Sequence, residues 1–430
     1  MATETITIRC VIAGGGPAGM MLGFLLARAG IDVLVLEKHA DFLRDFRGDT
    51  IHPSTLELMY ELGLLDDFLK RPHQEVRELT AQIGEESVII GDFRYLPTHC
   101  KFIALMPQWD FLNFLAEQAR RYAGFHLRMQ ARVTDLIIED DRVVGVRAET
   151  PDGPLEVRAD LVVGADGRHS DVRERAGLEV EDLGAPMDVL WLRLSKKPKD
   201  AQQTLGRIQA GVVFVMLDRG DYWQCAYVIP KGGYDKLRAA GLEAFRASIV
   251  ALNPTLADRV HEIATWDDVK LLTVSVDRLK SWCRPGLLCI GDAAHAMSPI
   301  GGVGINLAIQ DAVAAANILW EKLRAGPVPL EVLNKVQERR EWPTRATQRL
   351  QLFIQDRIIS SVLVLTTQPR PPFAVRLLQW LPYLRRFPAR VLGVGFRPEH
   401  VHTPEVVPAP AAASPPPLLG RSARNAPGGG

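Results

Sequence analysis

The sequence predicts an α/β protein in which a mixed-sheet domain is inserted into a βαβ domain, with helices near the C-terminal end. A strand at 6–13, a glycine-rich turn, a helix at 18–29 and a β-branched strand at 31–36 form a βαβ unit of about thirty residues. Alternating apolar and polar residues indicate further strands within 131–165 and 182–275.

Local signals predict the elements between these patterns. Ser54-x-x-Glu57 is a capping box, so we expect a short helix to begin there. Apolar spacing predicts two longer helices, and turn residues between two strand-like segments predict a hairpin. The expected ranges are 54–63 for the capped helix, 107–122 and 304–324 for the longer helices, 212–217 and 223–229 for the hairpin, 287–290 for a short buried strand, and 345–400 for helices interrupted by prolines.

The length of the chain predicts more than one packed unit. Its 430 residues are too many for one ordinary domain, and its hydrophobic fraction of 47% is that of a globular protein. We therefore assign the βαβ domain to 1–75, 106–181 and 276–345, the inserted sheet domain to 76–105 and 182–275, a C-terminal helical region to 346–402, and a disordered Pro/Ala/Gly-rich tail to 403–430.

Composition excludes several classes of protein. Lys+Arg and Asp+Glu number 51 each, and a net charge of zero argues against a general nucleic-acid binder. Five cysteines without a Cys-x-x-Cys pair indicate a reduced compartment, with neither a disulfide framework nor a metal site. The N-terminus does not read as a signal peptide, and no apolar run reaches the ~18 residues of a spanning helix. We therefore expect a cytoplasmic protein.

The first glycine-rich turn has the spacing of a dinucleotide-binding motif. Gly14 permits the tight turn, Gly16 lets the backbone approach a pyrophosphate, and Gly19 allows the helix to pack on the strand. Glu37, at the end of the second strand, is placed to accept a hydrogen bond from a ribose hydroxyl. The candidate cofactor contacts of this segment are Gly14, Gly16, Pro17, Ala18, Gly19, Glu37 and Lys38.

Two further polar residues have both a functional and a structural interpretation. Arg47 could pair with a phosphate or a flavin edge, or could be a surface arginine. Asp166-Gly167 follows an apolar strand. Near a phosphate, the Asp166 carboxylate would need a cation or a hydroxyl as partner, and Arg173 is a plausible cation. The structural alternative is a plain turn, which is the commoner meaning of an Asp-Gly pair.

A second glycine-bearing segment supplies an acid suited to a flavin's ribityl chain. Asp292 follows a short apolar strand, and the glycines of 299–304 let the backbone lie flat against a planar ring. The helix that begins near Gly304 would point the N–H groups of Ile305 and Asn306 at the ring's pyrimidine end. His295 invites a proton-transfer role, but a histidine here is more often a packing or hydrogen-bonding residue.

The order of these three motifs resembles the three fingerprints of the class A flavoprotein monooxygenases. Their best-known member is para-hydroxybenzoate hydroxylase, and relatives hydroxylate ubiquinone precursors. The resemblance covers about residues 5–345. It implies an FAD-binding Rossmann-like (βαβ) domain, an inserted substrate-binding sheet domain, and FAD as cofactor. It also implies that NAD(P)H and O₂ serve to hydroxylate or epoxidise an aromatic or other electron-rich small molecule through a flavin C4a-hydroperoxide.

The resemblance also assigns roles to individual residues. Glu37 would bind the adenosine ribose, Arg47 the FAD, and Asp292 the ribityl chain. Asp166 would serve both FAD and the incoming NAD(P)H. Two more positions match the family's pattern: Gln108 would contact the flavin, and the carbonyl of Pro299 would line the ring face where oxygen reacts.

The inserted sheet would roof the substrate pocket. Aromatic and large apolar residues are its candidate wall residues, although strand alternation would point only half of them inward. These candidates are Phe214, Met216, Tyr222, Trp223 and Tyr227. No arginine or tyrosine clamp stands out, so the acceptor stays open among phenols, quinone precursors, polyketides and terpenoids.

Other functions remain to be weighed. Residues 223–230 are faintly similar to the tryptophan-containing motif of flavin-dependent halogenases, and a prenyl reductase is a further enzyme alternative. A protein that binds FAD and a ligand without turnover is the non-enzymatic alternative. Residues 359–400 are compatible with peripheral membrane contact, although packing on the FAD domain is the more usual explanation. The sequence leaves open a monomer or a homodimer.

Overall fold

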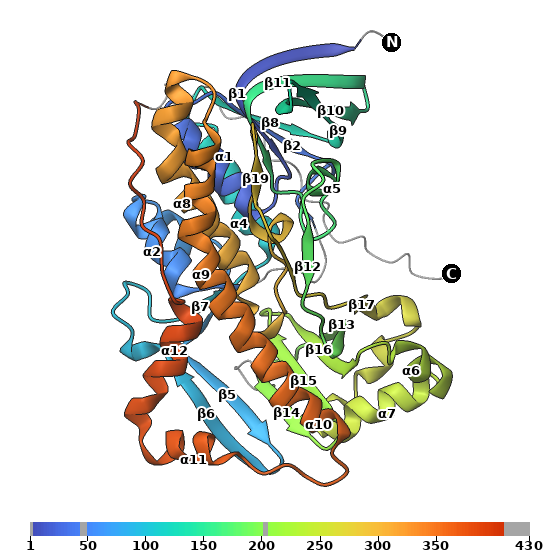
Figure 1. The fold of residues 1–430 in the computed structure, drawn as a ribbon. Helices are drawn as coiled ribbons and strands as arrows, with labels where there is room; N and C mark the ends of the chain where they lie inside the picture. The colour runs from blue at the N-terminus through green and yellow to red at the C-terminus, as the bar shows by residue number, and fades with distance from the viewer. Residues whose placement is uncertain (1–2, 44–49, 201–204, 408–430) are drawn as a thin grey trace, which may run out of the picture.

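The computed structural model describes residues 3–43, 50–200 and 205–407. Its upper part, in Figure 1, is built on the predicted βαβ unit. β1 (Glu4–Ala13) pairs in parallel with β2 (Val33–Glu37) and, on its other side, with β11 (Gly153–Gly164). α1 (Pro17–Arg28) connects β1 to β2. The α/β class and the βαβ unit predicted from the sequence are confirmed.

The first sheet brings the predicted cofactor motifs to one edge. Its strand order is β19-β20-β11-β1-β2-β8, and β9 and β10 extend it beside β11. Because β20, β11, β1 and β2 are parallel, their carboxyl ends meet at the same edge. The other strands span Phe125–Met129 for β8, Arg132–Glu139 for β9, Arg142–Thr150 for β10, Cys283–Arg284 for β19 and Leu287–Cys289 for β20.

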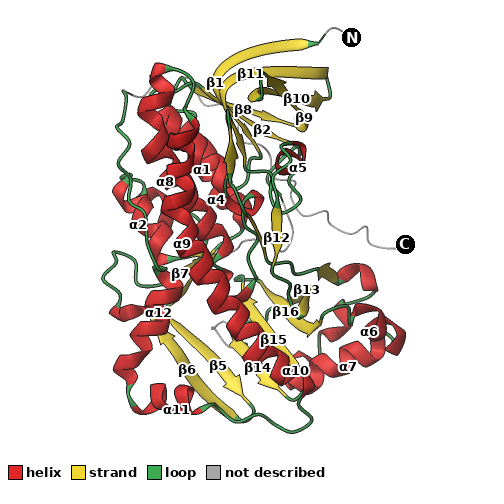
Figure 2. Ribbon diagram, in the orientation of Figure 1, coloured by secondary structure: helices red, strands yellow, loops and turns green. Residues whose placement is uncertain are grey.

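Helices cover the face of this sheet that carries α1. α4 (Gln108–Ala119) and α8 (Gly304–Ala325) both pack on α1, as Figure 2 shows in red. The segment Ile300–Ala325 is long and apolar enough to cross a membrane, which the sequence did not lead us to expect, but 67% of its apolar window is buried inside the protein. It is therefore a core helix. Smaller helices span Pro53–Glu61 for α2, Leu65–Leu69 for α3 and Asp171–Arg175 for α5.

A second sheet forms the lower part of the molecule in Figure 1. Its order is β17-β13-β16-β15-β14-β5-β6, so it combines two separate segments of the chain through the parallel pair β14–β5. The predicted hairpin is present as β15 and β16. The strands span Glu78–Ile83 for β5, Glu86–Asp92 for β6, Met187–Ser195 for β13, Leu205–Gln209 for β14, Val212–Asp218 for β15, Tyr222–Pro230 for β16 and Lys270–Leu272 for β17.

The two faces of the second sheet pack against different helices. One face packs on α7 (Leu242–Leu252), next to α6 (Tyr234–Ala240). The other face meets the end of α9 (Leu330–Ile354), which continues through a π-helical turn, Gln355–Ile359, into α10 (Ser360–Val364). The described residues also form two small sheets. One contains β3 (Thr50–Ile51), β7 (Ile103–Leu105) and β4 (Gln74–Val76), and the other contains β12 (Val180–Asp182) and β18 (Asp277–Leu279).

Helix α9 runs along the molecule from the first sheet domain to the second sheet (Figure 1). It passes through residue 345, where we had placed a domain boundary, so that boundary falls inside a helix. Proline does not end this helix: Pro343 lies within it. α11 (Phe373–Trp380) and α12 (Arg386–Gly393) then pack on β6.

Two local predictions were wrong. The capping box at Ser54 does not form: His52 is the N-cap of α2 and Pro53 its first residue, so Ser54 lies inside the helix. The tail was expected to be disordered from 403, but Thr403 is buried and the N–H of Val406 donates to the carbonyl of Arg28 at the end of α1. Residues 408–430 lie outside the described part of the chain.

Candidate cofactor and substrate site

The glycine turn between β1 and α1 has the shape that a bound pyrophosphate requires. Gly14 has φ of +107°, and a Cβ there would lie 2.3 Å from the carbonyl oxygen of Ala165. A Cβ on Gly19 would lie 1.9 Å from the carbonyl oxygen of Gly14. A Cβ on Gly16, in contrast, would meet no described atom within 4 Å. The protein itself therefore requires Gly14 and Gly19, whereas Gly16 faces space that an FAD pyrophosphate fits.

Glu37 lies directly beneath this turn. Its Oε2 accepts a hydrogen bond from the N–H of Gly15 at 2.9 Å, and its Oε1 accepts one from the N–H of His39 at 3.0 Å. The carboxylate is buried and held at the carboxyl end of β2, where a ribose is bound in βαβ nucleotide sites. Lys38 is exposed beside it, and Arg47 lies outside the described residues.

Asp166 follows β11 and is half-buried next to the glycine turn. Its Oδ1 accepts from the hydroxyl of Ser170 at 2.5 Å, and its Oδ2 accepts from the N–H of Val172 at 3.1 Å. Burial raises the pKa of Asp166, although these two hydrogen bonds act in the opposite direction. The cation that we expected beside it is elsewhere: Arg173 pairs with Asp277 at 3.3 Å.

Arg168 connects the loop of Asp166 to the loop of Asp292. Its Nη2 lies 3.4 Å from Oδ2 of Asp292, and both side chains are part-buried. Asp292 stands just after β20, at the same sheet edge as the glycine turn. Gly291, with φ of +60°, lets the chain pass close to Ala18 of α1, because a Cβ there would lie 3.1 Å from the Cβ of Ala18. The structure thus brings the three motifs together.

His295 points into the core and is only 1% exposed. Its Nε2 lies 2.6 Å from Oδ2 of Asp311, which is fully buried on α8. Its ring packs on Trp282, with the ring centroids 5.0 Å apart. This burial does not support the proton-transfer hypothesis for His295. Its position favours the structural alternative, in which it holds the Asp292 loop on α8.

The loop before α8 is fixed by side chains rather than left free. The hydroxyl of Thr50 donates to the carbonyl of Gly302 at 2.9 Å. Oδ1 of Asn306 accepts from the N–H of His52 and from the hydroxyl of Thr55, and its Nδ2 donates to the carbonyl of Thr50. Because the side chain of Asn306 is occupied in this way, its backbone N–H is the group that remains to face a flavin ring.

The remaining predicted flavin contacts are Ile305, Pro299 and Gln108. α8 begins at Gly304 without a side-chain cap, so its first N–H groups, including that of Ile305, have no acceptor within the helix. The carbonyl of Pro299 accepts a hydrogen bond from the N–H of Gly302 at 3.1 Å. Gln108 is the first residue of α4 and is half-buried.

Four of the predicted substrate-wall residues face away from this site. They are buried in one cluster with Phe245 and Ile249 of α7, and they are Phe214, Met216, Trp223 and Tyr227. Alternation along β15 and β16 therefore assigns the opposite face to their neighbours, and sequence alone does not show which set faces the cofactor. The residues of that opposite face are Val213, Val215, Ala226, Val228 and Trp191, and they pack with Ile300, Ile359 and Val362.

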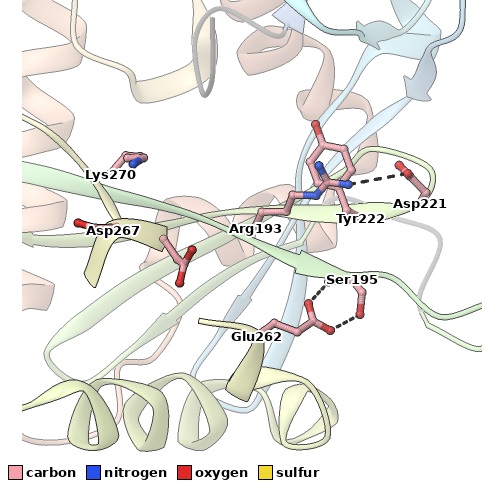
Figure 3. A pocket seen from close by; sticks show the side chains of 8 residues that line it. Arg193, Ser195, Asp221, Tyr222, Glu262, Asp267 and Lys270 are labelled. Atoms are coloured by element: carbon pink, nitrogen blue, oxygen red, sulfur yellow. Dashed lines mark hydrogen bonds and ion pairs between the residues drawn. The ribbon is translucent and has the colours of Figure 1, made fainter. Parts of the chain in front are cut away.

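Tyr222, the first residue of β16, lines a polar hollow instead. The guanidinium of Arg193 lies over its ring, 3.9 Å from the centroid. Figure 3 shows this hollow, which has a volume of about 560 Å³ and also contains Lys270 and Glu262. Its charged lining does not suit an apolar ring, so Tyr222 is not supported as a wall residue.

Known proteins resemble this chain over most of its length. Residues 7–349 match the family described as FAD binding domain. A 6-methylpretetramide 4-monooxygenase from Streptomyces rimosus is 35% identical over 368 residues, which cover 85% of this chain and 87% of that protein.

Two solved structures have a similar fold. Pseudomonas aeruginosa PqsL in complex with 2-aminobenzoylacetate has a TM-score of 0.69 at 24% identity, covering 83% of this chain and 97% of that chain. The myxobacterial chondrochloren halogenase CndH has a TM-score of 0.71 at 19% identity, covering 92% of this chain and 94% of that chain. At these identities the two likenesses show the fold alone.

Proposed function

The chain belongs to the FAD binding domain family and is an FAD-dependent monooxygenase that uses NAD(P)H and O₂ to hydroxylate an aromatic substrate, and on this premise we propose that its acceptor is a fused-ring phenolic polyketide. The observation that carries the proposal is the 35% identity to a 6-methylpretetramide 4-monooxygenase along almost the whole of both chains.

The side chains on one face of the second sheet favour a flat and largely apolar acceptor. The face that packs with Ile300 carries small and β-branched side chains, including Val213, Ala226 and Val228, together with Trp191. Gln224 lies on the same face by alternation and is buried, with its Oε1 accepting from Nε of Arg219 at 3.0 Å. Apolar surface with a few placed polar groups is what a fused phenolic ring system requires.

Each part of the cofactor site has a defined task in this function. FAD, when bound, supplies the redox chemistry: it takes up reducing equivalents from NAD(P)H and activates O₂. Gly16 and the N-terminus of α1 would bind the pyrophosphate, and Asp292 would accept hydrogen bonds from the ribityl hydroxyls. The positive end of the α8 dipole, at Gly304, would stabilise negative charge on the ring. The apolar sheet face keeps water from the reacting atoms.

A substrate screen tests the acceptor. NAD(P)H oxidation is measured with 6-methylpretetramide, with simple phenols and with quinone precursors, and products are analysed by mass. We expect the fused-ring compound to stimulate oxidation most strongly and to gain the mass of one oxygen atom. Stronger stimulation and hydroxylation of a simple phenol would contradict the proposal.

The same assay, repeated with added halide and with a prenyl compound as acceptor, separates the alternative functions. A product that gains chlorine or bromine when halide is present would indicate a halogenase, and a product that gains hydrogen at a prenyl double bond would indicate a reductase. The likeness to CndH does not itself favour halogenation, because 19% identity shows the fold alone. A protein that binds FAD but oxidises no NAD(P)H with any acceptor would support the non-catalytic alternative.

We further propose a cytoplasmic enzyme that contacts membranes peripherally through its C-terminal helices. Phe373, Trp380 and Tyr383 are 71%, 69% and 59% exposed, and Arg386 lies over the ring of Tyr383. Exposed aromatic rings beside cations suit the headgroup region of an anionic bilayer. Residues 357–398 contain no Asp or Glu, and their charged residues are Arg357, Arg370, Arg376, Arg385, Arg386, Arg390 and Arg397.

Vesicle sedimentation and light scattering test this second proposal. The protein should sediment with vesicles that contain phosphatidylglycerol, and the double substitution of Phe373 and Trp380 by serine should abolish this. No binding, together with a homodimer that the same double substitution converts to a monomer, would show that the surface joins two copies of the chain instead.

A further inference from the structure

One face of α9 carries buried glutamines that hydrogen-bond to the backbone of the segment leading to the flavin loop. Nε2 of Gln348 donates to the carbonyls of Asp277 and Ala296, at 2.8 and 3.1 Å. Gln351 and Gln355 follow at helical spacing on the same side, and all three side chains are at most 3% exposed. The glutamines therefore make ordered contacts within the core.

Gln351 binds both neighbours of Pro299. Its Oε1 accepts from the N–H of Ser298 at 3.2 Å, and its Nε2 donates to the carbonyl of Ser298 at 2.9 Å and to that of Ile300 at 3.0 Å. A primary amide pairs here with backbone groups as a neighbouring strand would. Pro299 has no N–H of its own, and Gln351 connects the backbone on both sides of it to α9.

Gln355 stands where α9 changes from an α-helix to a π-helical turn. Its Nε2 donates to the hydroxyl oxygen of Ser298 at 2.8 Å, and its Oε1 is buried without a hydrogen-bond partner among the described residues. A π-helical turn inserts an extra residue, which shifts the register of the side chains that follow. The turn thus allows Gln355 to face the loop while Ile359, four residues later, faces the second sheet.

Helix α9 and its continuation consequently touch both halves of the site. The glutamines hold the loop of Pro299, and Ile359 and Val362 pack with Val213 and Val228 of the second sheet. We propose that Gln348, Gln351 and Gln355 are positioning residues for the monooxygenase reaction. They set the distance between the flavin loop at Ser298–Ile300 and the sheet face that receives the acceptor. This inference rests on the proposed function in that it takes this loop to line the flavin ring.

The chain offers a matched control on the same helix. Oε1 of Gln337 accepts from the N–H of Trp282 at 2.9 Å, and its Nε2 donates to the carbonyl of Lys280 at 3.0 Å. Gln337 therefore makes the same kind of backbone contact as Gln351, but to a segment that precedes β20. Substitution by methionine keeps the length of either side chain and removes its hydrogen bonds.

The experiment compares Gln351→Met with Gln337→Met as FAD-loaded enzymes. In Gln351→Met we expect roughly fivefold or faster amide hydrogen exchange over residues 296–303 and a changed visible absorption band of the bound flavin. With an accepted substrate, a larger fraction of NAD(P)H consumption should appear as hydrogen peroxide. In Gln337→Met exchange should rise near 280–284 instead, with the flavin band and the peroxide fraction as in the unmodified enzyme.

Two results would overturn the proposal. One is unchanged exchange over 296–303 in Gln351→Met, and the other is a flavin band and peroxide fraction that match those of Gln337→Met. If Gln351→Met fails to fold, Gln355→Met, which loses a single hydrogen bond, takes its place with the same criteria. Exchange and absorption need no acceptor, so they decide this proposal even if no polyketide is hydroxylated.

Discussion

The imidazole Nε2 of His295 lies 2.6 Å from the carboxylate of Asp311, and both side chains are almost completely buried. The same carboxylate accepts from Nε of Arg340 at 2.9 Å and from the N–H of Gly291 at 3.2 Å. Arg340 also pairs with Glu399 at 3.1 Å. This network joins the Asp292 loop to α8, α9 and the C-terminal segment. It predicts that His295 holds this loop in place rather than transferring a proton.

His295→Ala tests that role. Removing the imidazole deletes a hydrogen bond to a buried carboxylate, so the free energy of unfolding should fall by about 2 kcal/mol. FAD retention should fall with it, because the Asp292 loop loses a support. Calorimetry and the flavin absorbance of the purified variant measure the two effects. Activity per bound FAD should stay close to that of the unmodified enzyme; a fully loaded but inactive variant would restore the proton-transfer role.

The network also predicts a pH dependence of stability. Burial alone would raise the pKa of Asp311, but His295 and Arg340 outweigh it and hold this pKa below its ordinary value. A depressed pKa contributes stability above the unfolded value of about 3.9, and this contribution is lost as the pH falls through the folded value. The free energy of unfolding of the unmodified enzyme should therefore exceed that of Asp311→Asn at neutral pH, and this difference should disappear as the pH falls below about 4. Urea unfolding at several pH values measures this difference, and a constant difference would contradict it.

Two glycines of the first turn should respond differently to substitution. Gly16→Val places a side chain in open space, so the apoprotein should fold normally and bind FAD at least about tenfold more weakly, a loss of about 1.4 kcal/mol or more. Gly19→Ala brings a Cβ against the carbonyl of Gly14 and should lower the melting temperature of the apoprotein itself. Calorimetry of the apoproteins and FAD titration separate the effects. Normal FAD binding by Gly16→Val would refute the assignment of the turn.

Val213 and Phe214 are neighbours on opposite faces of the second sheet and test which face receives the acceptor. Phe214→Ala should cost about 3–5 kcal/mol of stability, because it leaves a cavity under α7, with little change in KM for the acceptor. Val213→Ala should cost less stability and change KM. Steady-state kinetics measures KM for the two variants, and denaturant unfolding measures their stability. The reverse pattern would place the acceptor on the α7 side.

The sequence was informative wherever a function depends on local spacing. The turn at Gly14, the acid at Asp292 and the hairpin at 212–230 depend on neighbouring residues, and each was predicted. The choice between Val213 and Phe214 depends on which layer packs on each face, and strand alternation carries no such information. Pairings across the fold, such as Arg173 with Asp277 or Gln351 with Ser298, depend on tertiary structure in the same way.

The central claim is that one FAD extends from the glycine turn at Gly16 to the loop of Asp292. The most direct measurement is the flavin content of the purified protein, determined from its visible absorbance before and after incubation with FAD. We predict about one FAD per chain, and a clear reduction in Asp292→Ala. A colourless protein that takes up no added FAD would contradict the account.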